Sequence, residues 1–202
     1  MTKIDSTTLE SALQRVAEGA AGAAAELNAA DGQLGDGDLG ITVSKGFAEA
    51  AAAALPADVG LAFLECAKAF QRVSSSSYGT LVATGFMAAA KGAKGSQTLD
   101  VAAIPALVVA ARDAMIARGK GELGAKSVLD SLDACAKAID GVSAEDMGEK
   151  AVASARDTLT AFKGRPCKLG RARMFAEKSA QLDDPGQLAF LRIVEAAFPE
   201  AA

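Results

Sequence analysis

The sequence predicts an all-α fold: a single domain over residues 1–202, built as an antiparallel barrel or bundle of about eight helices. Half of the residues are hydrophobic, which is enough for a sizeable core, while aromatic residues make up only 4%. Alanine dominates, and it is the best helix former. Apolar residues recur at spacings of three and four along the whole chain, and no segment shows the alternation typical of a strand.

Four helices are predicted in the first half of the chain. Their expected ranges are 9–27, 42–54, 63–73 and 78–91. The first follows a Ser-Thr-Thr run at 6–8, whose hydroxyls can cap the free amides of a first turn. Pro56 ends the second, because proline cannot continue a helix. The serine run 74–77 separates the third helix from the fourth.

The remaining helices are predicted in the second half of the chain. Their expected ranges are 100–118, 128–139, 144–162, a short helix near 173–179 and a last helix opened by Asp183-Asp184-Pro185-Gly186. The last helix carries Leu188, Leu191 and Val194 on one face. Polar loops lie between these helices at 31–42, 74–79, 119–127 and 164–172 with 183–186, so any binding site is expected there.

Composition excludes several classes of function. The net charge of −4 argues against nucleic-acid binding. No stretch is long and apolar enough to span a membrane, and the first residues are not expected to act as a secretory signal. Three cysteines without a CxxC pattern indicate a reducing compartment, so a cytoplasmic protein is expected. Because the chain has no histidine, any chemistry that depends on histidine is excluded.

The segment 31–40 is the strongest chemical signal, because Asp31, Asp36 and Asp38 lie in it without a basic residue. Three carboxylates that close together favour a hard divalent cation such as Mg²⁺. A dinucleotide fingerprint is rejected because a helix precedes the glycines, and an EF-hand is rejected because position twelve would be Phe47. A solvated acidic turn remains the alternative.

Three weaker patterns could hold phosphate. Gly119–Ser127 is a near match to a Walker A loop, but Ala125 interrupts it and a helix precedes it. The serine run 74–77 is either a helix cap or a phosphate cradle. Arg171 follows Gly170 and could bind phosphate, whereas Asp184-Pro-Gly is a turn signal before a helix.

Together these motifs resemble the L-domain family of dihydroxyacetone kinases. The resemblance rests on residues 27–42, on Gly119 to Asp130, and on Gly170-Arg171-Ala172, Glu177, Ser179 and Asp184-Pro185-Gly186, in the family's order. It implies a barrel of eight antiparallel helices with a nucleotide at one end, held through two Mg²⁺ ions. Asp31, Asp36 and Asp38 would be the metal ligands. The implied nucleotide contacts are Leu39, Gly40, Ile41, Thr42, Ser76, Ser77, Gly119, Val128, Arg171, Asp184, Pro185 and Gly186.

The resemblance also implies a function. The chain is expected to bind ADP or ATP and to present a Mg-bound phosphate to a short ketose, which a separate K subunit carries covalently. No catalytic side chain is expected, because the reaction needs mostly positioning and charge neutralisation. A phosphotransferase-system protein is a possible donor, and the chain is expected to be a monomer or homodimer.

Several alternatives stay open. ADP could remain bound and be rephosphorylated in place, or ATP could exchange as the direct donor, with a three-carbon or a four-carbon ketose as acceptor. A chain of this fold could also be a non-enzymatic regulatory adaptor. The nucleotide domain of another kinase, such as a fatty-acid kinase, is a third reading.

Overall fold

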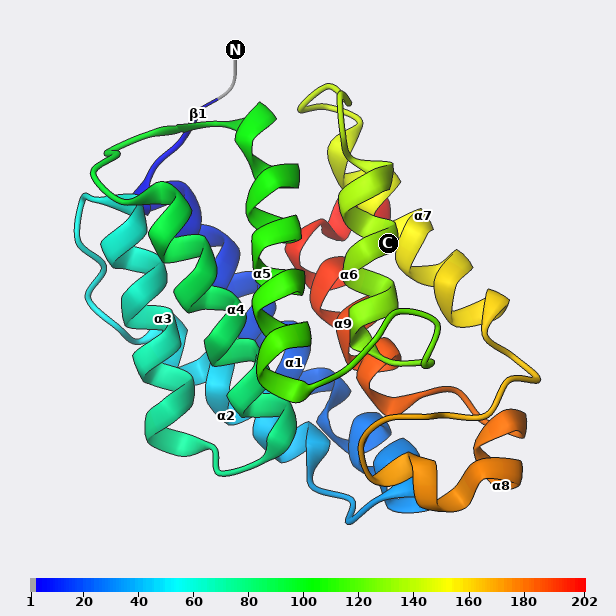
Figure 1. Cartoon of the computed structure of the whole chain (residues 1–202). Helices are drawn as coiled ribbons and strands as arrows, with labels where there is room; N and C mark the ends of the chain where they lie inside the picture. Colours follow the sequence, from blue (N-terminus) through cyan, green and yellow to red (C-terminus); the bar gives the residue numbers. More distant parts are fainter. Residues whose placement is uncertain (1–2) are drawn as a thin grey trace.

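The structure, a computed structural model, describes residues 3–202 and is almost entirely helical in that range (Figure 1). The α-helices are α1 (Ser6–Leu34), α2 (Leu39–Ala51), α3 (Val59–Val73), α4 (Ser77–Ala93), α5 (Ile104–Gly119), α6 (Val128–Ala138), α7 (Met147–Ala161), α8 (Ala176–Gln181) and α9 (Pro185–Ala197). Short 3₁₀ helices η1 (Val101–Ala103), η2 (Arg171–Phe175) and η3 (Pro199–Ala201) complete the helical set. The predicted all-α class is confirmed.

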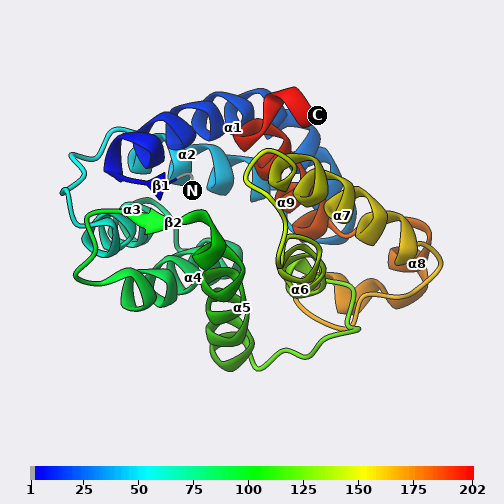
Figure 2. The same ribbon diagram turned by 90° about the horizontal axis from the view of Figure 1, so that it is seen from above.

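The long helices close into a barrel. Each packs on the next one in the chain, and α9 packs on both α7 and α1, so the ring is complete without α8 (Figure 2). The short helix α8 packs against η2 outside the ring. Because successive helices run in opposite directions, α2, α4, α6 and α9 all begin at the same end of the barrel (Figure 1). This end therefore collects four helix N-termini.

Between α2, α3 and α4 the core packs around a phenylalanine cluster. Phe70 is fully buried, and its ring meets Phe47 edge to face with 5.0 Å between the centroids. Gly46 makes room for this ring, because a Cβ there would lie 2.1 Å from Phe70 Cε1. Small residues thus let α2 and α3 approach, as the alanine-rich composition predicts.

Three details differ from the sequence expectations. Asp5 caps α1 by accepting a hydrogen bond from the Thr8 amide at 2.8 Å, so the cap is not in the run 6–8. Two short strands do occur: β1 (Lys3–Ile4) pairs antiparallel with β2 (Leu99–Asp100). In addition, α1 continues through Asp31 to Leu34, and α2 starts at Leu39 instead of Thr42.

Charged pairs join several neighbouring helices of the barrel. Arg192 of α9 donates from Nε and Nη2 to the Glu26 carboxylate of α1, both at 2.7 Å. Arg112 of α5 pairs with Asp133 of α6. None of the helices in residues 3–202 is both long and apolar enough to cross a bilayer.

Candidate functional site

The three predicted aspartates lie together at the end of the barrel where α2, α4, α6 and α9 begin. One carboxylate oxygen from each of Asp31, Asp36 and Asp38 lies within 4.8 Å of the others. Asp31 projects from the last turn of α1, and its Oδ2 accepts hydrogen bonds from the amides of Gly37 (2.8 Å) and Asp38 (3.1 Å). The predicted cluster thus forms, with Asp31 also shaping the turn that carries the other two.

The cluster carries a concentrated negative charge. Partial desolvation raises the pKa of Asp38, and the charges of Asp36 and Asp31 raise it further. Arg171, at the start of η2, forms an ion pair with Asp36 and opposes this effect. An all-oxygen set of three carboxylates matches the donors that Mg²⁺ prefers, so the residues fit a hard divalent cation.

The first turn of α2 lies beside the acidic cluster. Asn28 of α1 accepts a hydrogen bond from the Ile41 amide at 3.2 Å. The Leu39 side chain is buried in the core, which leaves only its backbone for a ligand. Thr42 donates a hydrogen bond to Ser76 Oγ at 3.2 Å, which ties the start of α2 to the start of α4. The amides of a first helical turn lack partners within the helix and favour anions.

The serine run is a helix cap in this structure. Ser76 is the N-cap of α4, and its Oγ accepts a hydrogen bond from the Gly79 amide at 3.0 Å. Ser74 Oγ lies 3.0 Å from Ser76 Oγ and packs where a side chain at residue 79 would lie. Ser77, the first residue of α4, is exposed at the same end of the barrel.

An apolar wall stands on the other side of these loops. Val128 begins α6, is buried, and packs in one cluster with Tyr78, Leu81 and Leu129. A Cβ placed on Gly186 would lie 3.4 Å from the Tyr78 ring and 3.6 Å from Val128 Cβ. The exposed Gly119 ends α5 near Leu81 of the same cluster. Pro185 is buried in the first turn of α9.

Asp184 is a buried carboxylate at the start of α9. Its Oδ1 accepts a hydrogen bond from the Gln187 amide at 2.8 Å, and Cys167 Sγ donates to its Oδ2 at 3.7 Å. Burial raises the pKa of Asp184 to about 6, although these hydrogen bonds and the charge of Lys126 act in the opposite direction. Burial and the Asp184 charge raise the pKa of the Cys167 thiol to about 11.

Asp184→Asn is expected to remove a pH dependence of stability. A folded-state pKa above the usual 3.8 means that the folded protein binds the extra proton between about pH 4 and 6. The free energy of unfolding therefore falls as the pH rises through this window, by up to about 3 kcal/mol. Asparagine can still accept the Gln187 amide and cap the helix.

Urea denaturation of both proteins between pH 4.5 and 7.5 measures this effect. The difference between the two curves should grow in favour of Asp184→Asn as the pH rises and should level off above pH 7. Parallel curves would show that Asp184 titrates normally in the folded protein.

Three residues of this region are not in the set predicted from the sequence. Asn28 and Tyr78 contact the predicted positions directly, as described above. Lys126 is buried and donates to three backbone carbonyls, so it cannot reach a ligand as a Walker A lysine would. Only the tertiary fold brings these side chains to the site.

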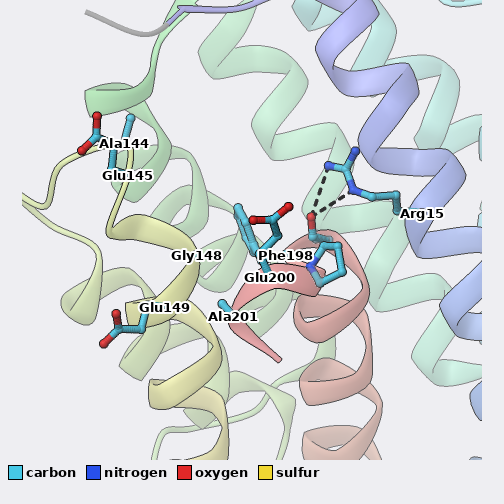
Figure 3. Close-up of a pocket in the computed structure, with 10 residues that line it drawn as sticks. Arg15, Ala144, Glu145, Gly148, Glu149, Phe198, Glu200 and Ala201 are labelled. Atoms are coloured by element: carbon cyan, nitrogen blue, oxygen red, sulfur yellow. Dashed lines mark hydrogen bonds between the residues drawn. The ribbon is translucent and has the colours of Figure 1, made fainter.

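A separate hollow lies toward the other end of the barrel (Figure 3). It has a volume of about 480 Å³ and is lined by Arg15, the start of α7 and residues 197–201. Arg15, labelled in Figure 3, donates hydrogen bonds from Nε and Nη2 to the Ala197 carbonyl, both at 3.2 Å. None of the predicted site residues lines this hollow.

Comparison with known proteins assigns the chain to one protein family. The model of the DAK2 domain matches residues 33–198. The ADP-binding subunit DhaL of the PTS-dependent dihydroxyacetone kinase of Lactococcus lactis is 30% identical over 165 residues, which cover 80% of each chain. The ADP-binding subunit DhaL of PEP-dependent dihydroxyacetone kinase 1 of Listeria innocua is 29% identical over 77% of each chain.

Solved structures share the fold. The dihydroxyacetone kinase of C. freundii superposes with a TM-score of 0.73 in its native form and 0.75 in its complex with AMP-PNP and Mg²⁺, at 20% identity. Each match covers 95% of the present chain, which spans only about a third of the C. freundii chains (34% and 33%). The family model and the two DhaL relatives show that this chain belongs to the DAK2 domain family of dihydroxyacetone kinase L subunits.

Proposed function

We propose that this chain is the nucleotide-binding subunit of a dihydroxyacetone-type kinase. It would hold ADP or ATP with Mg²⁺ and present the terminal phosphate to a short ketose that a separate K subunit carries. The observation that supports this most is the meeting of Asp31, Asp36 and Asp38 beside the N-termini of α2, α4, α6 and α9. The names of the two DhaL relatives, both ADP-binding subunits of dihydroxyacetone kinases, agree with it.

Each part of the site has a distinct task in this proposal. The acidic cluster would hold one or two Mg²⁺ ions. Bound Mg²⁺ would neutralise part of the phosphate charge. Amides of residues 39–42 and hydroxyls of Ser76 and Ser77 would take phosphate oxygens, and Arg171 would add a charged donor. Gly119, Val128 and residues 184–186 would enclose the base against the apolar wall.

The chain's own contribution to the reaction would be positioning. No side chain of the site is placed as a nucleophile, and the sequence offers no histidine to carry the ketose. Holding the phosphate in line with an acceptor on another subunit would lower the entropic part of the activation barrier. The three cysteines are free and buried, which agrees with a reducing, cytoplasmic location.

Isothermal titration calorimetry with ADP and ATP, with and without Mg²⁺, tests the proposal directly. Binding that requires Mg²⁺ supports it, and no binding by a fully helical protein would favour the regulatory adaptor. ADP that survives gel filtration of the purified protein would indicate a donor from the phosphotransferase system. Exchangeable ATP would indicate direct transfer. A phosphorylation assay with a K subunit then compares the two donors and both ketose lengths.

Arg171→Gln is expected to change the affinities for two ligands in opposite directions. Arg171 forms an ion pair with Asp36 of the acidic cluster. Removing the guanidinium frees that carboxylate and should tighten the binding of Mn²⁺ alone by about twofold to fivefold. The same loss removes a charged phosphate donor and should weaken Mg-nucleotide binding about tenfold. Calorimetry measures both affinities.

The matched control is Arg173→Gln. Arg173 is also exposed and lies two residues away, but it forms no ion pair with any residue in the range 3–202. Its substitution should leave both affinities unchanged. If Arg171→Gln weakened both ligands alike, Arg171 would serve only the fold of its segment.

A further inference from the structure

Lys126 is a buried lysine, and it forms no ion pair with a carboxylate in the range 3–202. Only 1% of the surface of this residue is exposed to solvent. Nζ donates hydrogen bonds to the backbone carbonyls of Leu182 (2.7 Å), Ser179 (2.8 Å) and Arg165 (3.0 Å). An ammonium group has three N–H donors, so every one of them is used. Burying a charge costs free energy unless its donors are hydrogen-bonded. The three carbonyls meet that requirement for the Lys126 ammonium group.

The three carbonyls mark the two ends of one excursion of the chain. Residues 165–182 leave the barrel after α7 and return before α9, carrying η2 and α8 outside the ring (Figure 1). Arg165 stands at the start of this excursion, and Ser179 and Leu182 stand at its end. The Lys126 ammonium therefore joins both ends at a single point.

Two further hydrogen bonds close the base of the excursion. The Gly164 amide donates to the Ala180 carbonyl, and the Cys167 amide donates to Ser179 Oγ, both at 2.9 Å. The outer part of the excursion carries Arg171, which reaches across to Asp36. The hydrogen bonds at the base of the excursion therefore also help to fix the position from which Arg171 contacts Asp36.

The backbone that carries Lys126 is itself held in place. Lys126 adopts φ of +58°, a left-handed conformation that is uncommon outside glycine. Asp130 accepts hydrogen bonds from the Ser127 amide at 2.9 Å and from the Gly124 amide, and the Ala125 carbonyl accepts the Lys168 amide at 2.9 Å. The ammonium group is therefore attached to a fixed support at the start of α6.

We propose that Lys126 is a positioning residue of the nucleotide site. It sets the location of Arg171, and of the α9 start that follows Leu182, without contacting the ligand. The inference rests on the proposed function, because it assigns Lys126 to the nucleotide site of that proposal. It differs from a phosphate-binding role, since the three carbonyls leave the ammonium no free donor for a ligand.

Hydrogen–deuterium exchange of the ligand-free protein tests the first part. Lys126→Met keeps the length of the side chain and removes all three donors. Amides in 164–182 should exchange at least about tenfold faster, because local opening loses its hydrogen-bonded closure, while amides of α1 to α3 stay unchanged. The control is Lys168→Met, which removes an exposed lysine of the same excursion that forms no ion pair with any residue in the range 3–202. Uniformly faster exchange would overturn the inference.

A double-mutant cycle tests the second part. If Lys126 acts through Arg171, the roughly tenfold loss of Mg-nucleotide affinity caused by Arg171→Gln should shrink to less than about twofold in the Lys126→Met background. Additive losses would mean that Lys126 serves stability alone. If the wild-type protein bound no nucleotide, the proposed function would fail, and the exchange measurement would still judge the control of the excursion by Lys126.

A second variant keeps the test decisive if Lys126→Met does not fold. Lys126→Gln keeps a polar side chain but loses the charge, one donor and one methylene of reach, so it cannot satisfy all three carbonyls. Faster exchange confined to 164–182, together with a smaller effect of Arg171→Gln, supports the coupling. Unchanged exchange there would contradict it.

Discussion

Asp36→Asn is expected to weaken Mg-nucleotide binding by about tenfold to a hundredfold. The substitution removes one of three charges that lie within 4.8 Å of one another, and with it the carboxylate that pairs with Arg171. An amide oxygen is a poorer ligand for a hard cation than a carboxylate. Because Asp36 is exposed and its side chain is not part of the core, the stability of the fold should change little.

Calorimetry with Mg-ADP measures the affinity, and urea denaturation checks the fold. Asp113→Asn is the matched control, because Asp113 is exposed on α5 and pairs only with Arg112 among the described residues. It changes the net charge by the same amount. Unchanged binding by Asp36→Asn would show that the cluster is a solvated acidic turn, and equal losses in both variants would reduce the effect to net charge.

The acidic cluster was predictable because its residues are close in sequence. Asp36 and Asp38 are two residues apart in a glycine-rich turn, so the pattern alone brings them together. The first helix was expected over 9–27, which put Asp31 in the loop with the other two carboxylates. In the structure α1 continues to Leu34, and Asp31 reaches forward to accept the amides of the turn.

Helix caps show both the strength and the limit of local signals. Ser76 and Asp184 were expected at helix starts, and both accept the amide three residues on. The cap of α1 was wrong by at least one residue, because Asp5 precedes a run of hydroxyls that satisfy the same rule. Several neighbouring cap residues leave the choice to the contacts of the folded chain.

Contacts between distant segments could not be predicted from the sequence. Lysine is normally exposed, so nothing local indicated that Lys126 would donate to carbonyls 39 to 56 residues further on. The meeting of Asp36 with Arg171 likewise depends on the closure of the barrel. The family resemblance implied which residues would line a nucleotide site, and only the folded structure shows the contacts that hold those residues in place.

Gly40→Ala is expected to lower the free energy of unfolding by roughly 3 kcal/mol or more. A Cβ on Gly40 would lie 2.0 Å from the Ala24 carbonyl oxygen and 2.8 Å from Asn28 Oδ1. The first obstacle is backbone, so α2 must move away from α1 as a unit. At Gly22 in α1 an added Cβ would meet no other part of residues 3–202 within 4 Å, so Gly22→Ala should instead stabilise by about 0.5–1 kcal/mol, the usual gain in a helix interior.

The same displacement should reach the site. Residues 39–42 start α2, and Asn28 holds the Ile41 amide, so a shift of α2 separates the first-turn amides from the acidic cluster. Mg-nucleotide affinity should therefore fall together with stability in Gly40→Ala and remain unchanged in Gly22→Ala. Urea denaturation and calorimetry measure the two effects. A loss of stability below about 1 kcal/mol would show that the helices separate easily, and Gly40 would then be needed only for the ligand.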